Sequence, residues 1–146
     1  VNRIPELSCA YETRIMGPED FAALYLPQWS NALCAERKQL DVLGVGALDQ
    51  GKLVGLAGCS CDCSEMWQIG VDVLPSYRRQ GIGSRLTSML AREIIRRGKV
   101  PFYCSAWSNI RSVRNAVKSG LIPAWVEMTA KPMALVDDMM RTDQER

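Results

Sequence analysis

The residues best suited to chemistry lie in one short stretch, Arg78-Arg79-Gln80-Gly81-Ile82-Gly83, between an apolar run and an amphipathic one. Gly81 and Gly83 carry no side chains that would keep a ligand away from the backbone. A helix that begins here adds unbonded N–H groups and the positive end of its dipole, and Arg78 and Arg79 add charge. This combination predicts a site for a phosphate-bearing ligand.

Two familiar phosphate motifs do not match this stretch. The Gly-Lys-Ser/Thr ending of a P-loop is missing, and the dinucleotide fingerprint needs a third glycine where this chain has Leu86. Ten basic residues and one acid, Glu93, lie between Arg78 and Lys118, which favours an anionic ligand. Aromatic residues are few here, so we expect a small polyanion and no nucleic acid. The alternative is a solvated basic helix face formed by Arg92, Arg96 and Arg97.

The apolar pattern places the turn between a strand and a helix. Alternation over 66–74 predicts a strand closed by Pro75, and apolar residues four apart over 81–97 predict a helix that ends at Gly98. Gly70 inside the strand predicts a bulge or the close approach of another backbone. The other expected elements are two short helices in 19–37 broken at Pro27, strands at 41–48, 52–61, 100–107 and 121–128, and a helix at 109–119.

Composition bounds the class of protein. The 146 residues, 47% apolar and 23% charged, are ordinary for one globular domain. No apolar run approaches roughly 18 residues and no leader is apparent, so we expect a cytoplasmic protein without a membrane partner. The chain starts at Val1 and not at a methionine, so the sequence allows for a further segment before it. With no histidine, and with Cys59, Cys61 and Cys63 alternating rather than paired, we expect reduced thiols and no metal.

These features resemble the GNAT superfamily of acetyl-CoA-dependent N-acetyltransferases. Residues 78–83 are similar to its pyrophosphate signature, in which Arg or Gln is followed by two variable residues, Gly, one variable residue and Gly or Ala. VDVLPSYRRQGIGSRL resembles the family's fourth strand, loop and following helix. NIRSVRNAVKSGL resembles its second conserved segment, an Asn followed by Gly eleven positions later. The resemblance extends from about Met66 to Leu121.

The resemblance implies an α/β fold for residues 1–146, with a mixed, mostly antiparallel central sheet splayed between its fourth and fifth strands and flanked by helices. It implies acetyl-CoA as co-substrate and transfer of the acetyl group to an amine of an unidentified acceptor. It also implies that the backbone of Val71 and Val73, with Asp72 between them, pairs with the pantetheine arm and that Asn109 contacts it. An N-cap is the alternative role for Asn109. The pyrophosphate would be held at Arg78, Arg79, Gln80, Gly81, Ile82, Gly83 and Ser84.

The resemblance implies less about the acid and the base. In the family a tyrosine seven residues after the Asn protonates the departing thiolate, but Ala116 occupies that position here. Candidate substitutes are Tyr103, Cys104, Ser105 and Ser108. Glu65 is the candidate base, with an exposed turn glutamate or a water relay as alternatives. A non-catalytic acyl-CoA-binding or regulatory module is the alternative function. The sequence does not decide between a monomer and a homodimer.

Overall fold

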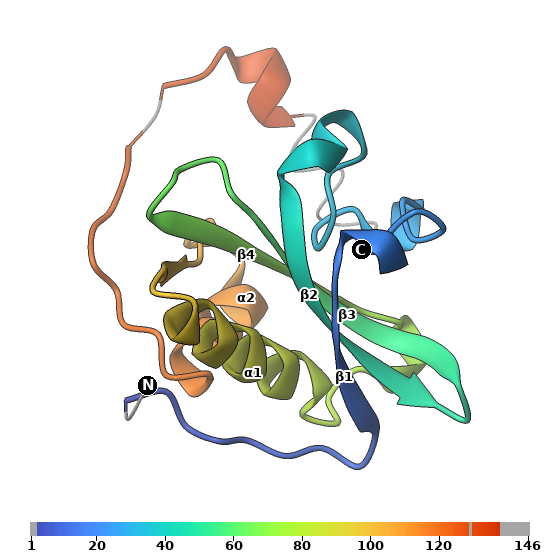
Figure 1. Cartoon of the computed structure of the whole chain (residues 1–146). Coiled ribbons are helices and arrows are strands. Elements are labelled where there is room, and N and C mark those ends of the chain that lie inside the picture. Colours follow the sequence, from blue (N-terminus) through green and yellow to red (C-terminus); the bar gives the residue numbers. More distant parts are fainter. Residues whose placement is uncertain (1–2, 129, 138–146) are drawn as a thin grey trace.

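The computed structural model describes residues 3–128 and 130–137, and its centre is one twisted sheet (Figure 1). The strands lie in chain order, and all neighbours are antiparallel except the last pair, which is parallel. The expected mixed, mostly antiparallel sheet is therefore confirmed. Its strands are β1 (Glu12–Met16), β2 (Asp41–Asp49), β3 (Lys52–Ser60), β4 (Met66–Val73) and β5 (Val100–Phe102).

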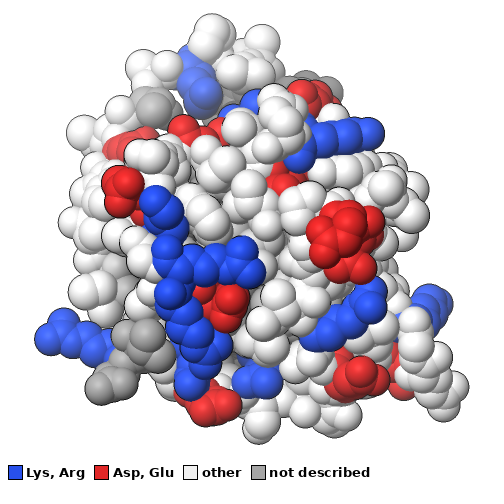
Figure 2. All heavy atoms as spheres, viewed as in Figure 1, with Lys and Arg blue, Asp and Glu red and all other residues white. Residues whose placement is uncertain are grey.

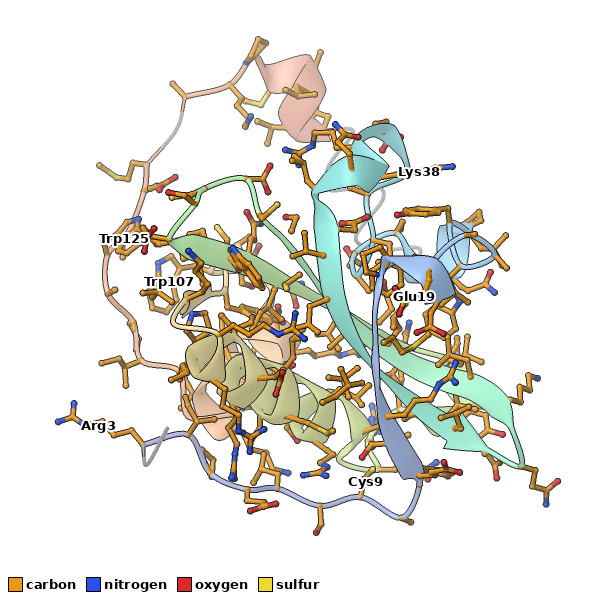
Figure 3. All side chains as sticks on the ribbon, in the orientation of Figure 1. Arg3, Cys9, Glu19, Lys38, Trp107 and Trp125 are labelled. Carbon is orange, nitrogen blue, oxygen red and sulfur yellow. The ribbon has the colours of Figure 1, made fainter. Side chains whose placement is uncertain are left out.

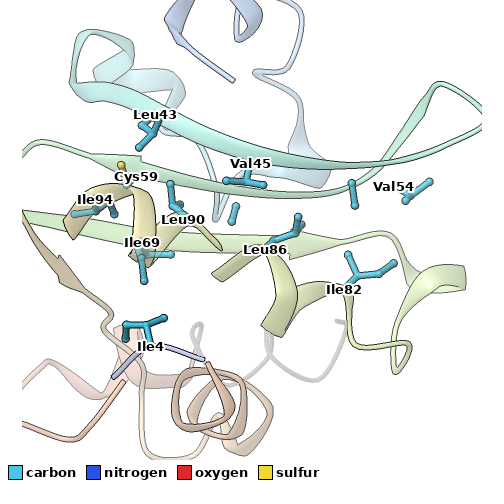
Figure 4. Packing of buried hydrophobic residues seen from close by; sticks show 13 residues of the cluster. Ile4, Leu43, Val45, Val54, Cys59, Ile69, Ile82, Leu86, Leu90 and Ile94 are labelled. Atoms are coloured by element: carbon cyan, nitrogen blue, oxygen red, sulfur yellow. The ribbon is translucent and has the colours of Figure 1, made fainter. Parts of the chain in front are cut away.

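Helix α1 (Ile82–Arg96) covers one face of the sheet and forms the main core with it. Its apolar residues recur four apart, so one stripe faces the strands while the other side meets solvent. Figure 4 shows this stripe against side chains of β2, β3 and β4. The buried helix residues that form it are Ile82, Leu86, Leu90 and Ile94.

Helix α2 (Ile110–Lys118) packs beside α1 on the same side of the sheet (Figure 1). Two polar contacts join the helices: Asn115 Nδ2 donates to Thr87 Oγ1 at 2.9 Å, and Ser119 Oγ donates to the Ser84 carbonyl at 3.2 Å. The position of α2 is thus set by specific hydrogen bonds as well as by apolar contact.

The opposite face of the sheet is covered by a loop and three short 3-10 turns. The expectation of two short helices in 19–37 is therefore wrong. The loop lies flat on the sheet at Gly58 and Gly70, where a Cβ would overlap the carbonyl oxygens of Ala32 and Asn31. Gly70 therefore marks a close approach, and β3 and β4 pair there without a bulge. Prolines open two of the turns and limit their length. They are η1 (Pro18–Asp20), η2 (Pro27–Trp29) and η3 (Ala35–Leu40).

Several expected strand boundaries are also corrected. β5 is only three residues long, and β1 was not anticipated from the sequence. β3 ends at Ser60, one residue before the expected end of the strand, so Cys61 and Cys63 lie beyond it. All six cysteines are free thiols.

The expected last strand at 121–128 is wrong, because the structure assigns no strand there. Pro123 lacks the N–H group that sheet pairing needs. The segment instead runs past β5, where the Trp125 ring stacks on Phe102 with centroids 5.3 Å apart. Figure 3 shows Trp107 and Trp125 on the side of the molecule away from Lys38 and Glu19. Within the described ranges, no helix has the length and apolar character to cross a membrane.

Candidate functional site

Strand β4 has an open edge where β5 leaves it. β4 pairs with β3 from Gln68 to Val73, but its parallel pairing with β5 ends at Gln68 and Phe102. The Leu74 N–H donates to the Val54 carbonyl at 3.0 Å, and the backbone groups of an antiparallel strand alternate in direction. Val71 and Val73 therefore turn their N–H and C=O groups away from β3, toward the gap.

Arg78 confirms this direction at the end of the strand. Its Nε donates to the Val73 carbonyl at 3.0 Å, so the guanidinium lies over the last open position of β4. Val71 is the strand residue whose backbone groups face the middle of the gap. The two valines singled out from the sequence thus have the backbone direction that pairing with an extended ligand requires.

The turn before α1 presents a row of N–H groups. Arg79 and Gly81 have left-handed backbones with φ of 64° and 80°. The first helical hydrogen bond runs from the Arg85 N–H to the Gly81 carbonyl at 3.0 Å. Among the described residues, the backbone N–H groups from Arg79 to Ser84 have no acceptor. Consecutive free N–H groups at a helix N-terminus form an anion site.

The side chains of the turn point away from this row. The Gln80 amide oxygen accepts from the Tyr11 hydroxyl at 2.6 Å, and its nitrogen donates to the Ser76 carbonyl at 3.4 Å. Ser84 Oγ donates back to the Gly81 carbonyl at 3.0 Å, and Ile82 is buried in the core. These side chains are bonded to or packed against the protein itself, so the groups that remain for a ligand are the backbone N–H groups.

Gly83 faces the space between β4 and α2. A Cβ built there would lie 3.2 Å from Asn115 Oδ1 and 3.7 Å from Val73 Cγ2. Larger side chains would therefore extend into the gap along the open edge of β4. The absence of a side chain at this position keeps the gap open.

Much of the basic charge that follows the turn is already paired. Arg92 bonds to Glu6 at 3.1 Å, and Arg96 and Arg97 both bond to Glu93 at 3.2 Å. Figure 2 shows basic side chains over α1 with acidic ones among them. The solvated helix face is thus the better account of these three arginines, and Arg78 and Arg79 carry the positive charge at the turn itself.

Asp72 has a different environment from the valines beside it. Its carboxylate accepts hydrogen bonds from the Asn31 N–H at 2.9 Å, the Asn31 side-chain amide at 2.6 Å and the Ala32 N–H at 3.0 Å. Its backbone stands opposite Leu56 of β3. Asp72 therefore fastens the covering loop to the sheet, and its contact with a cofactor stays a prediction.

Asn109 is the N-cap of α2, as the alternative reading supposed. Its Oδ1 accepts from the Ser112 N–H at 3.1 Å. The Ser112 hydroxyl in turn lies 2.8 Å from the hydroxyl of Tyr103, the half-buried residue that follows β5. Ser112 is one helical turn before Ala116, so these two hydroxyls lie next to the position where the resemblance implies a tyrosine.

Glu65 stands at the other end of β4, in an exposed turn. Its side chain is 69% exposed, and Oε1 lies 3.5 Å from Lys99 Nζ. Its carbonyl accepts from the Val100 N–H at 2.8 Å, at the start of the β4–β5 pairing. The open edge begins only after Gln68, so the role of Glu65 as a base stays a prediction without support from its surroundings.

A half-open cavity of about 190 Å³, which the sequence did not reveal, lies between the covering loop and the sheet. Asp41 lies in its wall, 3% exposed, and Oδ2 accepts from the Cys34 N–H at 2.9 Å. Burial raises the pKa of Asp41, and burial together with Asp41 raises the pKa of Tyr25 to about 12. The wall is formed by residues 30–34, Arg37, Asp41, Ser60, Gln68 and Gly70.

The comparisons with known proteins agree with this geometry. Residues 6–120 match the model of the acetyltransferase (GNAT) family. Aminoglycoside N-acetyltransferase AAC(6')-Iy in complex with CoA has a TM-score of 0.63 at 18% identity, with 88% of this chain and 99% of that chain covered. A GCN5-related N-acetyltransferase-like protein from Streptococcus suis has a TM-score of 0.66 at 21% identity, with coverage of 82% and 49%.

A third solved structure is the ribosomal-protein-alanine N-acetyltransferase from Brucella melitensis, with a TM-score of 0.60 at 19% identity and coverage of 84% and 99%. Among the curated proteins, no sequence matches the chain. At these identities the structures show the fold, whereas the family model covers most of the chain. The chain therefore belongs to the GNAT acetyltransferase family.

Proposed function

We propose that the chain transfers an acetyl group from acetyl-CoA to a primary amine by direct attack. One observation carries this proposal: the open edge of β4 leads directly to a turn whose N–H groups from Arg79 to Ser84 have no acceptor among the described residues. An extended amide-bearing arm that ends in phosphates fits both features at once. The open edge of β4 needs a partner that forms strand-like hydrogen bonds, and the N–H groups of the turn need an anion.

The chain's own residues divide the binding as follows. The backbone of Val71 pairs with the amides of the pantetheine arm, while Val73 becomes available when Arg78 turns from its carbonyl toward the phosphates. The N–H groups of the turn hold the pyrophosphate, and Arg79 adds a positive charge. Gly83 leaves room for the arm between β4 and α2. Acetyl-CoA supplies a thioester whose carbonyl carbon accepts a nucleophile.

In the transfer, the neutral amine nitrogen of the acceptor attacks the thioester carbonyl carbon, the carbon–sulfur bond breaks, and the sulfur leaves with the electron pair. The amine proton passes to solvent through water. The Tyr103 and Ser112 hydroxyls stand beside the space that Ala116 leaves, and we assign to them the proton that the thiolate receives. A thiolate is a moderate leaving group, so this proton assists the reaction without being indispensable.

The acceptor enters from the other face of the sheet. The cavity beneath the covering loop is bounded by Gln68 and Gly70, two residues of the strand that carries the open edge. The similar structures include an aminoglycoside N-acetyltransferase and a ribosomal-protein-alanine N-acetyltransferase. Both names describe acceptors that carry an amine, which supports an amine here without identifying it.

A screen of amine acceptors with acetyl-CoA tests the proposal. Thiol release reports turnover, and the mass of each product shows whether one acetyl group has been added to the amine. We expect amine-dependent thiol release with a matching product. Acetyl-CoA binding without turnover across chemically diverse amines would instead support the non-catalytic module.

A further inference from the structure

One row of residues crosses the sheet from the cavity wall to the open edge. Asp41 of β2 stands opposite Ser60 of β3, Ser60 opposite Gln68 of β4, and Gln68 opposite Phe102 of β5. Directly opposed residues point to the same face of a sheet, and the first three all line the cavity. The cavity therefore extends across three strands, from the Asp41 carboxylate to the point where β4 and β5 part.

Asp41 is a buried carboxylate: burial raises its pKa, and the nearby Arg37 guanidinium acts in the opposite direction without forming an ion pair with it. It is 3% exposed, and within the described part of the chain no lysine or arginine forms an ion pair with it. Arg37 also lines the cavity, but it is paired with Asp62. Buried carboxylates normally have a positive partner, because desolvation of the charge is costly. A cation that enters the cavity would supply this partner.

The distance from Asp41 to the gap is too long for direct proton transfer. Neighbouring strands lie about 4.8 Å apart, so the gap beyond β4 is about 12 Å from the axis of β2. The hydrogen bond between an ammonium group and Asp41 accounts for about 3 Å of this distance, and the approach of an amine to the thioester carbon accounts for about another 3 Å. The two nitrogen atoms would then be about 6–9 Å apart.

We propose that the acceptor is a small diamine, or a larger amine with the same spacing, whose second ammonium group is held by Asp41 while the first is acetylated. This inference rests on the proposed acetyl transfer and names the class of its acceptor. Extended diaminobutane, diaminopentane and diaminohexane have the required separation of nitrogens. Ethylenediamine is too short to reach both points.

The test compares matched amines with the full chain and acetyl-CoA. The probes are ethylenediamine, diaminobutane, diaminohexane, butylamine and hexylamine, and the readout is the ratio of kcat/KM for each diamine to that of the monoamine of equal length. We expect the longer diamines to be favoured about tenfold or more, beyond the factor of two that comes from their two reactive ends. Ethylenediamine should lack this advantage.

Asp41→Asn should reduce the ratio to about that factor of two. Asparagine keeps an oxygen that accepts from the Cys34 N–H, so the wall of the cavity is preserved, and a melting curve checks the fold. Glu36→Gln is the control, because it removes an exposed carboxylate from η3 beside the cavity without releasing Arg37 from Asp62. The control should retain the diamine preference, since the ratio depends on the buried carboxylate and not on general negative charge.

The possible failures are distinguishable. Transfer to diamines and monoamines at equal kcat/KM, or a preference that survives Asp41→Asn, overturns this inference and leaves the proposed acetyl transfer intact. A preference lost equally in Glu36→Gln also overturns it, because the effect would then be one of general charge. No transfer to either series overturns the diamine inference, whereas the proposed acetyl transfer fails only if the screen of chemically diverse amines also shows no turnover.

Discussion

The hydroxyls of Tyr103 and Ser112 lie 2.8 Å apart and join the end of β5 to the first turn of α2. Ala116 follows one turn later on the same helix, in the position where the family resemblance implies a tyrosine. Under the proposed mechanism, a proton donor that is absent from the helix is supplied by the residue that follows the neighbouring strand. The proposal that these hydroxyls replace the missing tyrosine rests on this relationship.

Tyr103→Phe should lower kcat by up to about 10²-fold, the low end of general acid assistance, because a thiolate leaves moderately well without help. The affinity for acetyl-CoA should stay unchanged. The double variant Tyr103→Phe, Ala116→Tyr should recover part of the rate by placing a phenol on the helix. Ser105→Ala is the control. Wild-type kcat in Tyr103→Phe would exclude this hydroxyl as the donor.

Gly81→Ala should weaken acetyl-CoA binding by about tenfold or more, because its φ of 80° is unfavourable for alanine and the N–H row would lose its direction. Gly51→Ala is a matched control in the β2–β3 turn, with a φ of 81° and no atom within 4 Å of the added Cβ. The two variants carry similar backbone strain, and only one lies at the site. Calorimetric titration with acetyl-CoA separates them.

Gly83→Val tests the same site through volume rather than strain. Its side chain would enter the gap between Val73 and Asn115, so we expect a folded protein with reduced affinity for acetyl-CoA. Unchanged affinity in both Gly81→Ala and Gly83→Val would remove the turn from the binding site.

The parts of the fold that follow local rules were predictable from the sequence. β4 and α1 have clear periodicity, and Pro75 and Gly98 mark their ends, so both elements and the turn between them were placed correctly. β1 was missed because only two of its five residues are strongly apolar and its partner, β2, lies about 30 residues away in sequence. Its strand character comes from tertiary pairing rather than from local pattern.

The cavity residue Asp41 could not be recognised for a similar reason. In the sequence it is an acid at the start of an apolar strand, which is commonly exposed. It becomes buried because the covering loop folds over it, and that loop is held by Asp72, 31 positions further on. The Tyr103–Ser112 pair likewise requires the packing of α2 against the end of β5. Only the spacing of Ser112 and Ala116 was available from the sequence.

The melting temperature of Asp41→Asn should exceed that of the wild type most at neutral pH. Burial raises the pKa of Asp41, so folding favours its protonated form, and the carboxylate weakens the fold as pH rises from its ordinary pKa of about 4 through the raised value. Asparagine does not titrate. The difference in melting temperature should therefore shrink as pH falls, and a difference that grows toward acid pH would contradict the raised pKa.

The cysteines should differ in their rates of alkylation by iodoacetamide. The backbone N–H groups of Glu65 and Met66 lower the pKa of the exposed Cys63, whereas burial raises the pKa of Cys59 to about 12. Because the thiolate is the reactive form, Cys63 should be modified early at neutral pH and Cys59 last. Peptide mass mapping over time measures this order. Equal rates for the two thiols in the folded protein, as expected in denaturant, would be inconsistent with the packing of β3.

The most direct test of the cofactor site is an NMR titration of the isotope-labelled chain with acetyl-CoA. The structure leaves the N–H groups from Arg79 to Ser84 without acceptors among the described residues and turns the Val71 backbone toward the gap. We predict that the amide signals of these residues shift most at saturation, while those of the β2–β3 turn at Gln50 and Gly51 do not move. Saturating acetyl-CoA that leaves the signals of residues 79–84 and Val71 unchanged would contradict the account.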